Sequence, residues 1–126
     1  MRGVFTGLKV KELFRVKKQR MIEFSPNLYL GESMREKDFE KAKRQILETP
    51  LLSNVFLLTL PRGGTDQLEV ISSRYLAQGY YADHGVRVVG VAKDHEDAVS
   101  LIIKITEDCL SIRKDCNLKE FCEWES

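Results

Sequence analysis

The sequence contains little of what marks special classes of protein, with 3 prolines, 3 cysteines and 8 glycines in 126 residues. The scarcity of glycine and proline excludes a collagen-like chain, and a hydrophobic content of 43% excludes a disordered one. Three cysteines are too few for the disulfide framework of a small secreted domain. No apolar run approaches the roughly 20 residues needed to cross a bilayer, so the sequence predicts no transmembrane segment.

An excess of charge of one sign is also lacking, since 20 Lys and Arg residues against 19 Asp and Glu residues give a net charge of +1. This balance is an average of two unlike parts. Residues 1–20 carry seven cations and one anion, whereas residues 21–126 carry 13 cations and 18 anions. Such asymmetry is typical of a segment with its own partner or docking surface. We therefore divide the chain into a basic N-terminal segment, 1–20, and a single domain, 21–126.

Three interpretations of the basic segment are open, because apolar residues alternate with its cations. It could bind nucleic acid or an anionic membrane surface, although the acidic body argues against a broad nucleic-acid-binding face. We favour a segment whose apolar residues dock on the body of the same chain. Lysines interrupt its apolar residues, which argues against a signal peptide. The change of pattern at Met21 also suggests Met21 as the biological start.

From Met21 onward, short apolar runs alternate with segments of helical periodicity. Strands are predicted at 27–30, 55–60 and 86–91, and helices at 33–48, about 65–84 and 94–112. Asp94 is expected to cap the last helix, with Asp97 complementing its N-terminus. The order βαβαβα predicts a small α/β domain with a three-stranded, mainly parallel sheet, which the N-terminal segment could extend.

The strand at 55–60 (VFLLTL) is apolar at consecutive positions, which indicates burial on both faces and favours a parallel sheet. If strand order followed chain order, both crossover helices would lie on one face and leave the other bare. We therefore expect strand order 2-1-3, or a cover supplied by residues 1–24 or by a second subunit. The apolar tail residues Leu118, Phe121 and Trp124 must likewise cover their own sheet or another chain.

Ligands of open parallel sheets bind beyond the carboxyl ends of the strands, so the loops there are the first candidates for a site. The loop after 55–60 combines a cation, two glycines and a predicted helix start, which suits an anion. The candidate ligand-binding residues are Arg62, Gly63, Gly64, Thr65, Lys93 and His95. We favour a simpler interpretation, in which the glycines form a turn, Thr65 caps a helix and His95 is solvated.

The sequence contains no nucleotide-binding glycine motif, no nucleophile elbow and no closely spaced cysteine pair. Cys109 fits the core face of the last helix, and the spacing of Cys116 and Cys122 does not match a structural zinc site. We therefore expect no metal and no cofactor, assign no catalytic residue, and leave open whether the chain is an enzyme. An odd number of cysteines without a secretory leader favours a cytoplasmic location.

Residues 86–99 (VRVVGVAKDHEDAV) resemble a part of many small bacterial α/β domains, a likeness of fold that carries no function. The favoured function is a non-catalytic interaction module that forms a homodimer. The small sheet, the apolar tail and the lack of a catalytic set support it. The alternative is a binding protein or enzyme that takes a small anionic ligand at the carboxyl ends of the strands.

Overall fold

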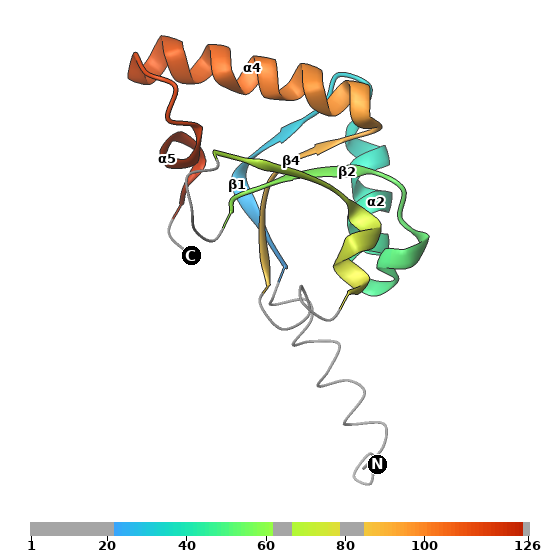
Figure 1. Cartoon of the computed structure of the whole chain (residues 1–126). Coiled ribbons are helices and arrows are strands. Elements are labelled where there is room, and N and C mark those ends of the chain that lie inside the picture. The colour runs from blue at the N-terminus through green and yellow to red at the C-terminus, as the bar shows by residue number, and fades with distance from the viewer. Residues whose placement is uncertain (1–21, 62–66, 79–84, 125–126) are drawn as a thin grey trace, which may run out of the picture.

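The computed structural model describes residues 22–61, 67–78 and 85–124, whose helices pack on a four-stranded sheet (Figure 1). The strands are β1 (Ile22–Leu30), β2 (Phe56–Thr59), β3 (Glu69–Ser72) and β4 (Val86–Ala92). The α-helices are α2 (Glu36–Glu48), α4 (His95–Arg113) and α5 (Leu118–Cys122), and the 3-10 helices are η1 (Pro50–Leu52) and η2 (Ser73–Ala77). The strand order is β1-β4-β2-β3, with β1 parallel to β4 and β2 antiparallel to both neighbours.

The predicted α/β class is confirmed, but the predicted three-stranded, mainly parallel sheet is wrong. The strand predicted at 55–60 contains β2, which lies between β4 and β3 and has two completely buried leucines, Leu57 and Leu58. A central strand is buried on both faces whichever way its neighbours run. Consecutive apolar residues therefore locate this strand without giving its direction. The alternative order 2-1-3 is also wrong, because the three predicted strands lie in the order 1-3-2, with β4 between β1 and β2.

The helix predicted at about 65–84 is also wrong over its described part, which forms strand β3 followed by η2. Val70 and Ile71 pair with Leu58 and Leu57 and pack on opposite faces of the sheet. This alternation is the period of a strand. The neighbouring β2 supplies backbone partners for these β-branched residues, and this pairing overrides the helical spacing of the apolar residues.

The other two predicted helices are confirmed as α2 and α4. Asp94 caps α4 as expected, because its Oδ1 accepts a hydrogen bond from the backbone N–H of Asp97 at 2.8 Å. The N-cap of α2 is Arg35 and not Ser33, where the sequence predicts the helix to start. Gly85, just before β4, has a φ of 75°, a left-handed conformation that favours glycine.

Both faces of the sheet are covered by the chain itself (Figure 1). On one face, α2 and η2 contribute Ile46 and Leu76 to a cluster with Leu57 of β2. On the other face, α4 contributes Ile105, which packs with Leu58. The face that the sequence leaves bare in chain-order topology is therefore covered within one copy of the chain.

The apolar tail covers the α4 face of its own sheet, one of the two alternatives that the sequence left open. Leu118 in α5 is buried, with 8% of its surface exposed. Phe121 and Trp124 pack against the same cluster. This packing removes one argument for a second subunit, since the tail has a partner within its own chain.

Strand β1 lies at the edge of the sheet and departs from regular pairing in its middle. Phe24 pairs with Val88, but the next pair is Tyr29 with Gly90, so five steps along β1 match two steps along β4. The bulged part contains Pro26, which has no N–H to donate and is tolerated at edges and bulges. Ser25 and Asn27 of the bulged part border the same cavity as Phe121 and Trp124 of the tail.

Candidate functional site

The strand directions place the loops after β2 and after β4 at opposite ends of the sheet, although the predicted parallel sheet would bring them together. Strand β2 leaves the sheet at the start of β4, where the N–H of Leu60 donates to the carbonyl of Arg87 at 3.0 Å. Lys93 and His95 instead follow the end of β4, which has seven residues and spans roughly 20 Å. The chain therefore enters the predicted glycine loop from the opposite edge of the sheet. The candidate residues Arg62, Gly63, Gly64 and Thr65 lie outside the described residues.

Lys93 and His95 have exposed side chains at the edge where β1 and β4 end. The ring of His95 packs edge-on against Phe56, with 5.7 Å between the ring centroids and an interplanar angle of 81°. This exposure agrees with the simpler interpretation of His95 as a solvated residue in the first turn of α4. The predicted anion site at this edge stays a prediction.

Asp97 connects the segments that follow β1 and β4. The sequence predicts for this residue only a favourable interaction with the N-terminus of the helix. Its side-chain oxygens accept the backbone N–H groups of Lys93 at 2.9 Å and Ser33 at 3.3 Å. Asp97 is 7% exposed, and its carboxylate lies against Gly31. Two backbone donors that an anionic ligand could use at this edge therefore bind a carboxylate of the protein itself.

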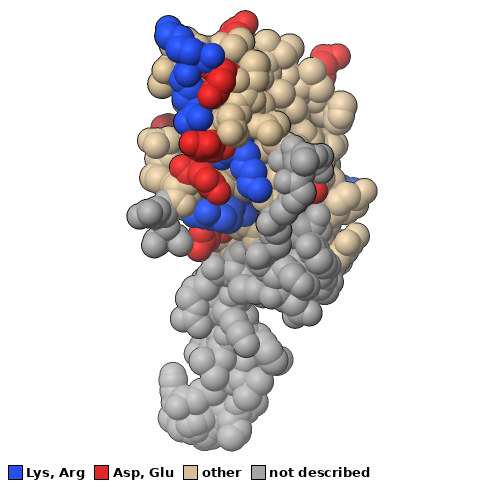
Figure 2. Space-filling view, turned by 60° about the vertical axis from the view of Figure 1, so that its left-hand side comes forward, with Lys and Arg blue, Asp and Glu red and all other residues tan. Residues whose placement is uncertain are grey.

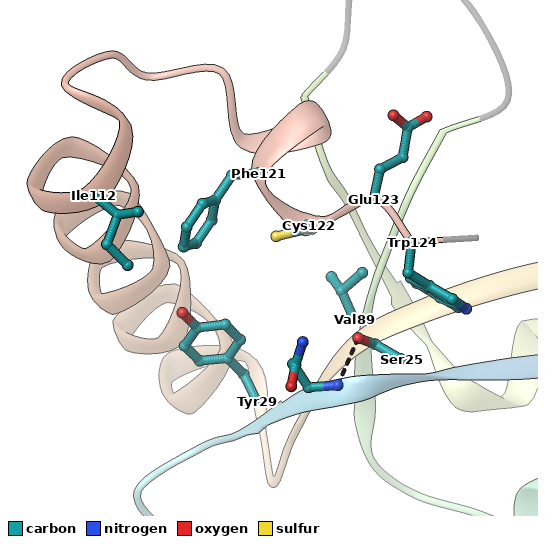
Figure 3. Close-up of a pocket in the computed structure, with 9 residues that line it drawn as sticks. Ser25, Tyr29, Val89, Ile112, Phe121, Cys122, Glu123 and Trp124 are labelled. Carbon is teal, nitrogen blue, oxygen red and sulfur yellow. Dashed lines mark hydrogen bonds between the residues drawn. The ribbon is translucent and has the colours of Figure 1, made fainter. Parts of the chain in front are cut away.

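A pocket of about 300 Å³ opens on the α4 side of the sheet, beside the bulge of β1 (Figure 3). We call it the tail pocket. It is lined by Ser25, Asn27, Tyr29, Val89, Ile112, Phe121, Cys122, Glu123 and Trp124. Phe121 and Trp124 are among the tail residues expected from the sequence to cover the sheet, but no pocket is predicted there, because the bulge depends on how β1 pairs with β4. Pro26 is the one signal of the bulge in the sequence.

One wall of the tail pocket is held by a hydrogen bond between β1 and α4. The hydroxyl of Tyr29 donates to Oδ2 of Asp108 at 2.8 Å. Burial and this hydrogen bond raise the pKa of Tyr29 above its ordinary value. The hydroxyl therefore stays protonated and keeps donating to Asp108, whose Oδ2 also lies 3.8 Å from Nζ of Lys104.

The opposite wall is Trp124, which is held by Arg87 of β4. The guanidinium carbon of Arg87 lies 4.0 Å from the centroid of the Trp124 ring, a stacked cation–π geometry. Arg87 also donates a hydrogen bond to the backbone carbonyl of Trp124 and forms an ion pair of 3.2 Å with Glu23. These contacts fix the tail on the sheet.

The thiol of Cys122 lies between these two walls and points into the tail pocket (Figure 3). Burial raises the pKa of this thiol to about 11, so it is protonated at neutral pH. All three cysteines are free, with Cys109 buried and Cys116 exposed. The predicted position of Cys109 on the core face of the last helix is confirmed.

Charged side chains of both signs are mixed on the face shown in Figure 2. Among the described residues, Arg113 is paired with acidic side chains, since it contacts Asp115 at 3.1 Å and Glu120 at 3.4 Å. A broad basic surface for nucleic acid is therefore not present among the described residues of this face. Residues 1–20 lie outside the described residues, so their partner stays a prediction.

Within residues 22–61, 67–78 and 85–124, no group of three or more His, Cys, Asp and Glu side chains is arranged to hold a metal ion. None of the helices in the same ranges is both long and apolar enough to span a bilayer. In comparisons with known proteins, no family model, no curated protein and no solved structure matches the chain.

Proposed function

We propose that the chain is a non-catalytic interaction module that pairs with a second copy of itself through α4. The observation that carries this proposal is that α4 is apolar on two sides, of which the sheet covers one. The apolar residues buried against the sheet are Ala98, Leu101, Ile105 and Cys109. On another side, Val99, Ile103 and Leu110 are exposed at 44%, 54% and 45%. We call these three residues the α4 outer stripe.

The members of the α4 outer stripe form a line along the helix. At 3.6 residues per turn, Val99, Ile103 and Leu110 fall within about 40° of one another. Their line points about 135° away from the mean direction of the buried apolar residues of α4. A helix that is apolar on several sides is typical of a helix buried on several sides. The stripe therefore supports a contact with another protein surface.

Helix α2 offers a comparison within the same chain. Its buried residues, Ala42 and Ile46, face the sheet. Its exposed positions carry charged residues, among them Lys37, Glu40 and Lys41. This is the pattern of a helix that is covered on one side only. The difference between the two helices favours a second contact for α4 in particular.

A second copy of the chain is the simplest partner, because a two-fold contact lets one apolar stripe cover itself. Antiparallel packing of two α4 helices would place Val99 of one copy opposite Leu110 of the other, with Ile103 near the axis. One helix stripe buries less than the roughly 800 Å² per partner of a standard interface. We therefore expect dissociation in the micromolar range rather than an obligate dimer.

The proposal includes a cytoplasmic location and a bacterial source. The three free thiols support a reducing compartment. The likeness of residues 86–99 to small bacterial α/β domains supports the source, as a matter of fold alone.

Two isoleucines of α4 allow a matched test of the pairing. Ile103 and Ile112 are exposed at 54% and 70%, and their separation of two and a half turns puts them on opposite sides of the helix. In sedimentation equilibrium over the micromolar range, Ile103→Glu should weaken self-association at least about tenfold, equivalent to 1.4 kcal/mol. Ile112→Glu should associate like the unmodified chain. A strict monomer, or equal effects of the two variants, would contradict the proposal.

A further inference from the structure

We propose that the tail pocket binds a small, neutral aromatic molecule that carries an amide or a similar hydrogen-bonding group. This inference concerns a different surface from the α4 outer stripe and is independent of the proposed pairing. It depends on the shape of the pocket, its aromatic walls, its polar groups and its charge.

The tail pocket is held open in the structure by contacts that lie outside its cavity. Tyr29 is fixed by Asp108 of α4, and Trp124 is fixed by Arg87 of β4. Between them, the bulge of β1 keeps the strand away from regular pairing with β4. Ligand pockets are usually preformed in this way, because a rigid wall needs no ordering when the ligand enters.

The size and the walls of the tail pocket suit an aromatic ring. Its volume of about 300 Å³ is about twice that of a cavity that holds benzene, so it has room for one or two rings. Figure 3 shows Tyr29 and Phe121 on one side of the pocket and Trp124 on the other. Aromatic side chains favour stacked and edge-on contacts with a ring.

Two neutral polar side chains that line the tail pocket, Ser25 and Asn27, lie on the bulge of β1. The hydroxyl oxygen of Ser25 accepts the backbone N–H of Asn27 at 3.0 Å, which leaves the hydroxyl hydrogen as a donor. The side-chain amide of Asn27 offers both a donor and an acceptor. These neutral groups match an amide, which needs one donor and one acceptor.

Charge excludes an anion as the preferred ligand of this pocket. None of the nine lining residues is cationic, and the charged one is Glu123. A carboxylate entering an apolar pocket loses hydration and here gains no cation in return. The tail pocket therefore differs from the anion site predicted at the strand ends.

Cysteine labelling tests occupancy with an internal control. Cys122 lines the tail pocket, whereas Cys116 is exposed outside it. Benzamide, benzoate and cyclohexanecarboxamide serve as probes, because they vary the charge and the aromatic ring separately. Benzamide should slow maleimide labelling of Cys122, read by peptide mass spectrometry, at least about fivefold at saturation and leave Cys116 unchanged. The fluorescence of Trp124, the single tryptophan, should change over the same concentration range.

The other two probes test the recognition of charge and ring. Benzoate and cyclohexanecarboxamide should each need at least about tenfold higher concentration than benzamide for the same protection. Equal protection by benzoate would overturn the charge argument, and equal protection by cyclohexanecarboxamide would overturn the aromatic one. No protection of Cys122 by benzamide, or the same slowing at Cys116, would overturn the site.

Three exposed positions, Asn27, Asn54 and Ile112, allow variants that do not disturb the core. Asn27→Ala should weaken protection by benzamide at least about fivefold, whereas Asn54→Ala, an exposed asparagine outside the tail pocket, should leave it unchanged. Ile112→Lys adds a cation at the rim of the tail pocket. It should therefore strengthen the binding of benzoate relative to that of benzamide. An unchanged preference in Ile112→Lys, or unchanged benzamide protection in Asn27→Ala, would overturn the assigned recognition.

Discussion

The carboxylate of Asp97 lies where a side chain at position 31 would have to begin. A Cβ built on Gly31 would be 2.0 Å from Oδ2 and 2.4 Å from Cγ of Asp97. The same carboxylate accepts N–H groups from Ser33 and Lys93. One acidic side chain in the first turn of α4 thereby joins the segments that follow the two parallel strands. Glycine at position 31 leaves room for this carboxylate, because it has no Cβ.

The first prediction is that Gly31→Ala lowers the free energy of unfolding by about 2–3 kcal/mol, because the new methyl group displaces Asp97 from its two donors. Urea denaturation measures this loss. The control is Gly90→Ala, whose nearest contact would be 3.1 Å to Cδ2 of Leu101 rather than 2.0 Å to a carboxylate oxygen, so it should cost less. In the background of Asp97→Ala, the added cost of Gly31→Ala should fall below about 1 kcal/mol. Equal costs in the two backgrounds would contradict this mechanism.

The second prediction concerns the cap of α4. Asp94→Ala should lower the free energy of unfolding by about 1 kcal/mol, because the N–H of Asp97 loses its acceptor. Asp94→Asn keeps a side-chain oxygen and should cost less. Thermal denaturation of the three proteins measures the order of stability. A loss for Asp94→Asn as large as that for Asp94→Ala would show that charge rather than the hydrogen bond matters.

The third prediction is that Arg87→Ala loosens the tail, because Arg87 stacks on Trp124 and binds its carbonyl. We expect a loss of about 1–2 kcal/mol and a shift of Trp124 fluorescence to longer wavelength as the indole becomes more exposed. Glu23→Gln removes the ion pair and leaves the stack, so its fluorescence should resemble that of the unmodified chain. The same shift in both variants would assign the effect to the ion pair instead.

The fourth prediction concerns the pH dependence of Cys122. Its folded pKa is raised from 9.0 to about 11, so folding disfavours the thiolate. The contribution of this group to stability is therefore complete below pH 9 and is lost as the pH rises toward 11. Because thiolate is the reactive form, labelling of Cys122 in the folded protein should keep rising about tenfold per pH unit through this range. A plateau near pH 9 would show that the thiol is not desolvated.

The fold is predicted well where local chemistry decides it. The start of α4 follows from Asp94, and the buried strand β2 follows from its run of apolar residues. The prediction fails at β3, where Leu68 and Ile71 fit a helical spacing but Val70 and Ile71 find backbone partners on β2. Those partners are more than ten residues away in the sequence, and periodicity alone does not report them.

At the candidate site, too, local features are predicted from the sequence and long-range contacts are not. The predicted strand-end loops meet only where β1 and β4 end, because the antiparallel β2 leaves at the other edge. Asp97 is visible in the sequence as an acidic residue at a helix start, but its bonds to Ser33 and Lys93 require β1 and β4 to be parallel neighbours. The tail pocket likewise needs both the bulge of β1 and the return of the tail.

The sequence by itself determined the α/β class, the positions of α2, α4 and the central strand, and the apolar character of the tail, because hydrophobic spacing and capping act over a few residues. The sequence also shows a basic segment, 1–20, joined to an acidic body. The basic segment lies outside the described residues, so its role stays a prediction. Tertiary structure alone decided the strand order, the direction of β2 and the meeting of Tyr29 with Trp124 across a pocket. These features depend on backbone hydrogen bonds and side-chain contacts between segments far apart in the sequence. Local hydrophobic patterns do not specify which of these segments become neighbours.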